Sequence, residues 1–79
     1  MADIDQIEKV ITESLVTFGA DPAAINRDAD LEALDVDSLD LAELSQIIEE
    51  QFGVEMTAQD ATTIKTVGDA IDFVAERAG

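Results

Sequence analysis

The sequence predicts an all-α fold: a four-helix bundle with three longer helices, one short third helix and a long first loop. Apolar residues recur at spacings of three and four in separate stretches of the 79-residue chain. Residues typical of helix starts and ends bracket these stretches. The chain contains no cysteine, so apolar side chains must form its core without disulfides. We therefore expect residues 1–79 to fold as one small domain.

The first helix is predicted over residues 3–18. Asp3 and Gln6 have the spacing of a capping box, and Gly19 is a favourable stop. The buried stripe repeats at helical intervals: Ile4, Ile7, Ile11, Leu15 and Phe18, widened by Val10.

A long connector follows, over about residues 20–36. Asp21 precedes Pro22, which disfavours helix at that point and predicts a turn. Apolar residues spaced along the connector predict that it packs over the bundle: Ile25, Leu31, Leu34 and Val36.

The second helix is predicted over residues 38–52. Asp37 is a suitable N-cap with Asp40 at the third helical position, and Gly53 ends the helix. The expected buried stripe contains Leu41, Leu44, Ile48 and Phe52, broadened by Ile47. Residues 54–57 should be extended or form a turn.

A short helical turn is expected over residues 59–64, and a longer helix closes the chain. Thr66 and Asp69 have the capping-box spacing at the start of that helix. Its predicted buried face comprises Val67, Ala70, Ile71, Val74 and Ala78.

The charge is strongly one-sided, with 19 acidic and four basic residues and a formal net charge of −15. Such a surface repels phosphate backbones and anionic lipid, so we expect neither nucleic acid nor a membrane as partner. It should attract basic proteins instead. The sequence shows no leader peptide or membrane-spanning stretch, and the expected compartment is the cytoplasm.

The residue inventory argues against catalysis and against a metal site. The chain has no histidine, cysteine or tyrosine, so a nucleophilic serine would lack its usual base. The acidic run that begins at Asp35 resembles a calcium loop. An EF-hand, however, needs glycine at position 6 and glutamate at position 12, where this chain has Asp40 and Gln46. We therefore expect no enzyme activity and no bound metal.

Ser38 allows two interpretations. It is either an ordinary residue in the first turn of a helix or an exposed site of modification. Leu39 falls off the buried stripe and should point outward beside it, and the acids Asp37, Asp40 and Glu43 surround both residues. An exposed hydroxyl beside an exposed leucine and a collar of carboxylates favours modification and docking.

The triplet Asp37-Ser38-Leu39 resembles the attachment site of acyl carrier proteins. Residues 37–52 are similar to that family's second helix almost position by position. Residues 52–55 resemble its exit from that helix, and residues 66–69 resemble the start of its last helix. The similarity extends over the whole chain in length, acidity and helix order.

This resemblance implies that Ser38 carries 4′-phosphopantetheine, transferred from coenzyme A by a phosphopantetheinyl transferase. The arm would supply the thiol that the chain lacks and hold acyl groups as thioesters. Ketosynthases, acyltransferases and similar enzymes would dock through basic patches on a docking ridge of Asp37, Leu39, Asp40, Ala42, Glu43, Gln46, Glu49 and Glu50. The resemblance also implies a monomer, with a possible acyl cleft among the core residues Leu44, Ile48, Ile64, Ile71 and Val74.

Several positions depart from fatty-acid carriers. Ala42 and Gln46 are smaller or more polar than the ridge residues often found there, and residues 57–63 keep only Asp60 of a usually acidic segment. The Thr-Val-Gly-Asp run at residues 66–69 resembles discrete polyketide carriers. The expected function is therefore to carry acyl or polyketide intermediates. The alternatives are an aminoacyl or peptidyl carrier, or an acidic module that mimics nucleic acid.

Overall fold

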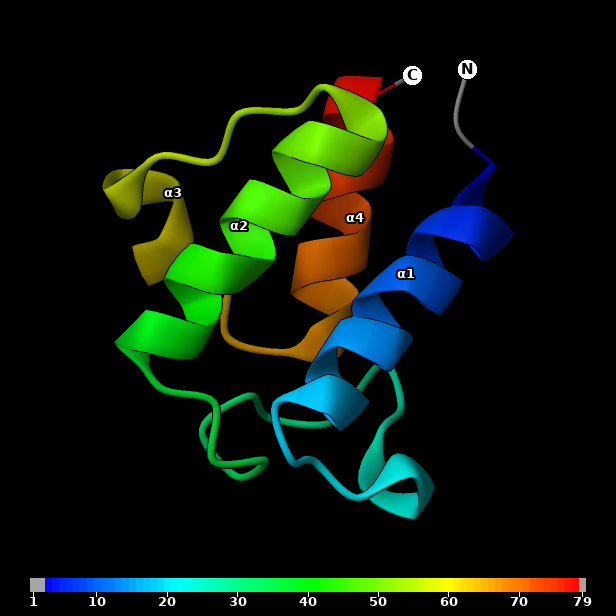
Figure 1. Cartoon of the computed structure of the whole chain (residues 1–79), viewed down its shortest axis with the longest axis vertical. Helices are drawn as coiled ribbons and strands as arrows, with labels where there is room; N and C mark the ends of the chain where they lie inside the picture. The colour runs from blue at the N-terminus through cyan, green and yellow to red at the C-terminus, as the bar shows by residue number, and fades with distance from the viewer. Residues whose placement is uncertain (1–2, 79) are drawn as a thin grey trace.

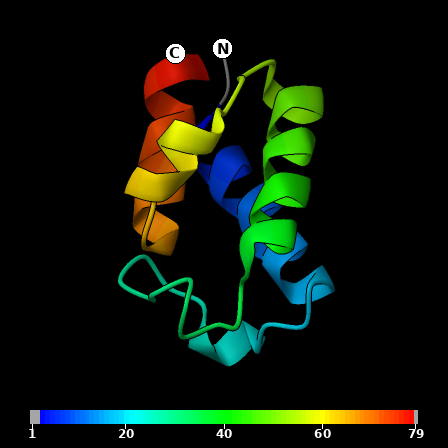
Figure 2. The ribbon, with the colours of Figure 1, turned by 90° about the vertical axis from the view of Figure 1, so that its left-hand side faces the viewer.

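The computed structural model describes residues 3–78 and consists of helices and loops. The elements in order are α1 (Ile4–Thr17), the 3-10 turn η1 (Pro22–Ala24), α2 (Ser38–Phe52), α3 (Ala58–Thr63) and α4 (Val67–Ala78). Helices α1, α2 and α4 form the bundle, and α3 lies beside α2 at its outer edge (Figure 1). The loop between α1 and α2 crosses the end of the bundle opposite the start of α1 (Figures 1 and 2). The predicted all-α bundle with three longer helices, a short third helix and a long first loop is confirmed. No helix within residues 3–78 is long and apolar enough to cross a bilayer.

The core consists of aliphatic side chains from α1, α2 and α4, closed at its ends by loop residues. Its fully buried large members are Ile7, Ile11, Leu15, Leu44, Ile48, Val67, Ile71 and Val74. Leu31 and Val36 from the first loop, and Ile64 after α3, are also buried. The buried stripe predicted for α1 is wrong at Ile4, whose side chain is 47% exposed near the start of the helix.

Reciprocal capping boxes begin α2, α3 and α4. The sequence predicts the box of α4, whereas for α2 it predicts only that Asp37 is the N-cap. Asp37 accepts from the backbone N–H of Asp40, whose own carboxylate accepts from the N–H of Asp37, and Gly53 ends α2 with φ 69°. A third box, between Thr57 and Asp60, begins α3 one residue earlier than expected. These Thr57 hydrogen bonds lower the pKa of Asp60. At α1, Asp3 instead accepts from the N–H of Asp5, so the box predicted with Gln6 is wrong.

Backbone hydrogen bonds fix the long loop against the start of α4. The N–H of Leu31 donates to the carbonyl oxygen of Lys65 at 2.9 Å, and the N–H of Val67 donates to that of Ala29 at 3.0 Å. These bonds flank a single antiparallel bridge between Asp30 and Thr66. Although it contains only one 3-10 turn, the loop is therefore held at a defined position.

Gly68 extends this contact. Its N–H donates to the carbonyl oxygen of Arg27 at 2.9 Å, and a Cβ added at Gly68 would lie 2.9 Å from that same oxygen. The Arg27 guanidinium also reaches α4, where one nitrogen contacts both carboxylate oxygens of Asp72 at 2.8 and 2.9 Å. Asp72 raises the pKa of Arg27 through this hydrogen-bonded ion pair. The absence of a side chain at Gly68 is what allows the loop to approach α4 so closely.

We predict that Gly68→Ala destabilises the protein. A methyl group 2.9 Å from a backbone oxygen must displace the loop, which typically costs about 1–3 kcal/mol and outweighs the better helix propensity of alanine, about 1 kcal/mol. Thermal unfolding should show a melting temperature lower by roughly 4–8 °C per kcal/mol lost. Amide exchange should accelerate at Leu31 and Val67 more than at Ile11 in α1. An unchanged melting temperature would show that the loop adapts without cost.

Candidate functional site

Ser38 is the first residue of α2 and is exposed. Its backbone position is fixed by the capping box of Asp37 and Asp40. The free N–H groups at a helix start, together with the helix dipole, favour a phosphate group there. The chain has no histidine or cysteine that could activate the hydroxyl. The Ser38 side chain is therefore open to approach by another protein, and no histidine or cysteine of this chain lies beside it.

A tight turn leads directly into Ser38. The N–H of Asp35 donates to the carbonyl oxygen of Glu32, and the N–H of Val36 donates to that of Leu31, both at 3.1 Å. This pair of bonds is the Schellman pattern, which places one residue in the left-handed region, usually glycine. Here that residue is Asp35, with φ 61°. The buried pair Leu31 and Val36 anchors the turn to the core and so fixes where α2 begins.

The predicted docking ridge lies on the outer face of α2. Leu39 is 76% exposed, which confirms that it points away from the core. Leu39, Glu43, Gln46 and Glu50 follow one another at helical spacing along this face. Asp37, Ala42 and Glu49 are exposed alongside them, and Asp40 is half-buried.

The ridge carries negative charge only. From its N-cap to its last residue, α2 has no lysine or arginine. It has five carboxylates there: Asp37, Asp40, Glu43, Glu49 and Glu50. The four cations of the chain lie elsewhere. Lys9 is on α1, Arg27 on the first loop, Lys65 after α3 and Arg77 on α4. Among the described residues, no three acidic side chains gather closely enough to hold a metal ion.

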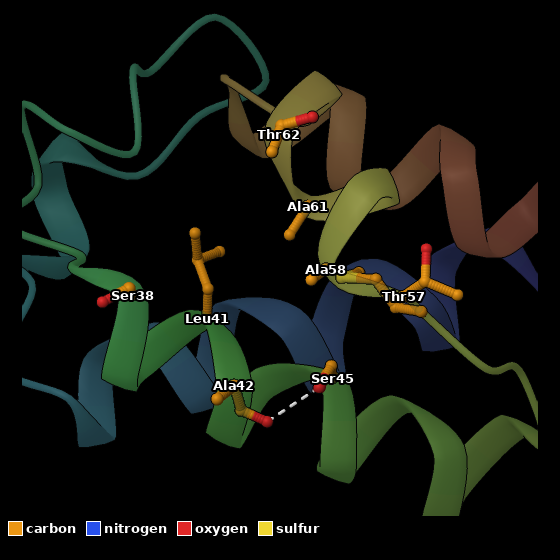
Figure 3. Close-up of a pocket in the computed structure, with 9 residues that line it drawn as sticks. Ser38, Leu41, Ala42, Ser45, Thr57, Ala58, Ala61 and Thr62 are labelled. Carbon is orange, nitrogen blue, oxygen red and sulfur yellow. Dashed lines mark hydrogen bonds between the residues drawn. The ribbon is translucent and has the colours of Figure 1, made fainter.

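A largely apolar groove of about 440 Å³ lies between α2 and α3 (Figure 3). Its lining comprises Ser38, Leu41, Ala42 and Ser45 from α2, together with Met56, Thr57, Ala58, Ala61 and Thr62. In Figure 3, Leu41 points from α2 toward Ala61 of α3. Leu41 is therefore half-buried at the groove, not in the fully buried stripe predicted for it.

The five residues proposed for an acyl cleft do not line this groove. Leu44, Ile48, Ile64, Ile71 and Val74 are all buried members of the core. The groove was not predicted from the sequence, since it arises from missing side-chain volume, which leaves only a weak local pattern. The available signal was the small residues Ala58 and Ala61, which recur at helical spacing on the short helix.

Comparisons with known proteins agree on one family. Residues 9–74 match the family described as "Phosphopantetheine attachment site". Two proteins named "Acyl carrier protein" are each 40% identical to this chain. The one from Chlamydia caviae aligns over 95% of both chains, and the one from Solidesulfovibrio magneticus over 100% of this chain and 99% of its own. A third, from Chlamydia felis, is 38% identical over 95% of this chain and 94% of its own.

We predict that the left-handed backbone conformation at position 35 makes the free energy of unfolding depend on which residue stands there. Asp35→Gly and Asp35→Ala remove the same charge, but only glycine adopts φ 61° without cost, while other residues lose about 1–2 kcal/mol. The glycine variant should therefore melt at least about 4 °C above the alanine variant. Equal melting temperatures for the two would mean that the turn is not strained.

Proposed function

Since this chain belongs to the acyl carrier protein family, we propose that Ser38 is the residue that bears its 4′-phosphopantetheine arm and presents acyl or polyketide intermediates as thioesters. Members of the family carry acyl groups on this covalent arm and do not catalyse reactions themselves. The single observation that supports Ser38 is its exposed hydroxyl at the start of α2, inside the matched region 9–74. Ser14 and Ser45 lack this setting: Ser14 is buried in α1, and Ser45 lies within α2 and donates to the carbonyl oxygen of Ala42.

The residue types in the chain determine what Ser38 and the arm would each contribute. Ser38 contributes an oxygen, and the arm contributes the reactive thiol that a cysteine-free chain cannot provide. The transferase would supply the base, because the chain has no histidine, cysteine or tyrosine to serve Ser38. The acyl group then travels on a flexible tether while the helices stay folded.

We assign partner recognition to the docking ridge. The transferase and acyl-processing enzymes, among them ketosynthases and acyltransferases, would approach with basic patches. Leu39 would insert into an apolar pocket beside them, because its side chain, 76% exposed, gains free energy when a partner covers it. Carboxylates around an apolar contact accelerate association and set orientation. A nucleic-acid mimic would need the charge but neither Leu39 nor Ser38.

We propose a polyketide carrier rather than a primary fatty-acid carrier, because the ridge and α3 depart from fatty-acid carriers and the Thr-Val-Gly-Asp run at residues 66–69 resembles discrete polyketide carriers. Ala42 and Gln46 give the ridge little apolar surface beyond Leu39, and α3 carries a single acid, Asp60. Enzymes that bind this chain should therefore depend more on the charge of the ridge and less on apolar contacts along α2.

We predict that incubation with a phosphopantetheinyl transferase and coenzyme A adds one arm per chain. Ser38→Ala should abolish the mass increase while leaving helicity unchanged, because Ser38 is exposed and its side chain takes no part in the capping box. Intact mass spectrometry measures the first effect and circular dichroism the second. Loading that persists in Ser38→Ala would disprove the assignment.

We predict that Glu43→Lys slows this loading without unfolding the protein. A substitution at an exposed helix position such as Glu43 normally changes the free energy of unfolding by less than about 0.5 kcal/mol. Reversing a charge on the ridge should nevertheless lower the loading rate at low salt by roughly tenfold, with a smaller effect at high ionic strength.

The matched control for that substitution is Glu76→Lys, which makes the same charge change at an exposed position on α4. Its loading rate should stay close to that of the parent protein. Equal slowing by both variants would indicate a response to net charge alone and would remove the special role of the ridge.

A further inference from the structure

A second groove, of about 320 Å³, lies between α1 and α2. We call it the α1–α2 groove. Its lining comprises Val10, Glu13, Ser14 and Thr17 from α1, and Ile47 and Gln51 from α2. It shares no residue with the groove beside α3, and the attachment of an arm at Ser38 gives it no role.

The α1–α2 groove borders the docking ridge. Glu43, Ile47 and Gln51 are spaced by four along α2, so their side chains form one row on the helix. Glu43 belongs to the ridge, and Glu50 of the ridge lies three positions after Ile47. An enzyme seated on the ridge therefore lies beside Ile47, and across the groove from it is α1.

The α1–α2 groove combines apolar side chains with hydrogen-bond acceptors. Val10 and Ile47 are half-buried, so part of each side chain is open to solvent. Ser14 Oγ donates its proton to the carbonyl oxygen of Val10 at 2.8 Å. Thr17 Oγ1 donates to that of Glu13 at 3.0 Å. Each hydroxyl oxygen keeps acceptor capacity after donating its one proton, and the exposed Glu13 adds a carboxylate.

This chemistry suits a cationic side chain with an aliphatic stem, such as arginine or lysine. The stem would cover the apolar surface, and the charged head would donate to the carboxylate and the hydroxyl oxygens. The lining itself has no lysine or arginine, and Glu13 makes no ion pair with another residue of the described range 3–78. A second copy of the chain is disfavoured as occupant, because each copy carries a formal charge of −15.

We propose that the α1–α2 groove receives a cationic side chain of the enzyme that docks on the ridge, with Glu13 as the carboxylate that pairs with it. The ridge contacts lie along a single helix, so they leave the enzyme free to rock about the axis of α2. A charge pair on α1 lies beside that axis and fixes the orientation in which the enzyme meets Ser38. This inference rests on the docking proposed above for the ridge.

The first test measures loading by a phosphopantetheinyl transferase with coenzyme A at low salt. Glu13→Gln should lower kcat/KM about threefold, the effect of losing one exposed ion pair, by raising KM while kcat stays unchanged. Glu13→Asp keeps the charge and should stay close to the parent value. Glu8→Gln removes the same charge at an exposed position of α1 outside the lining and should have no effect. Melting temperatures should confirm that the three variants stay folded.

The second test maps the contact by NMR. Labelled Ser38→Ala protein, which cannot be loaded, is titrated with the same transferase. Signals of Glu13 and Thr17 on α1 should shift together with those of Leu39 and Glu43 on the ridge.

Three outcomes contradict the proposals, and they are distinguishable. Shifts on the ridge without shifts on α1 would overturn the α1–α2 contact and leave the ridge intact. Equal slowing by Glu13→Gln and Glu8→Gln would indicate a response to net charge and would overturn the contact as well. A parent protein that is not loaded at Ser38 would instead refute the proposed function.

Discussion

The backbone pairing between residues 27–31 and residues 65–68 is the contact on which the site depends. The first loop has little regular structure of its own, so helix packing alone does not determine its path. Once Leu31 is fixed against Lys65, the turn that ends at Asp35 brings Val36 into the core. The start of α2, and with it Ser38, follows two residues later. A contact between the loop and α4 thus positions a hydroxyl on a different helix.

Much of this arrangement could be predicted from the sequence, because helix boundaries and buried stripes leave strong local patterns. The ends of α1 and α2 lie within one residue of the predicted positions, and Leu39 points outward as expected. The loop pairing could not be predicted, since it joins backbone atoms that every residue has. The left-handed conformation of Asp35 was equally hidden, because glycine is the usual signal for it.

Two of the four positively charged residues, both arginines, make side-chain contacts between elements of the fold. Arg27 joins the first loop to Asp72 of α4, and Arg77 lies 4.5 Å from the ring centre of Phe73 and 3.9 Å from Asp60 of α3. Both arginines therefore link elements that are distant in sequence, although these exposed contacts contribute little individually. The consequence is an electrostatic division of the molecule: the two arginines contact α4 from the loop and α3 from α4, while α2 carries only negative charges.

Two surfaces meet along helix α2, the charged docking ridge and the apolar groove beside α3, and only Ala42 belongs to both. Neighbouring positions on α2 therefore contribute to different surfaces of the protein. A substitution on the ridge can change its charge without altering the groove, and a substitution on α3 can reshape the groove without altering the ridge. Ala42 is the exception. A bulky residue there would change both surfaces at once.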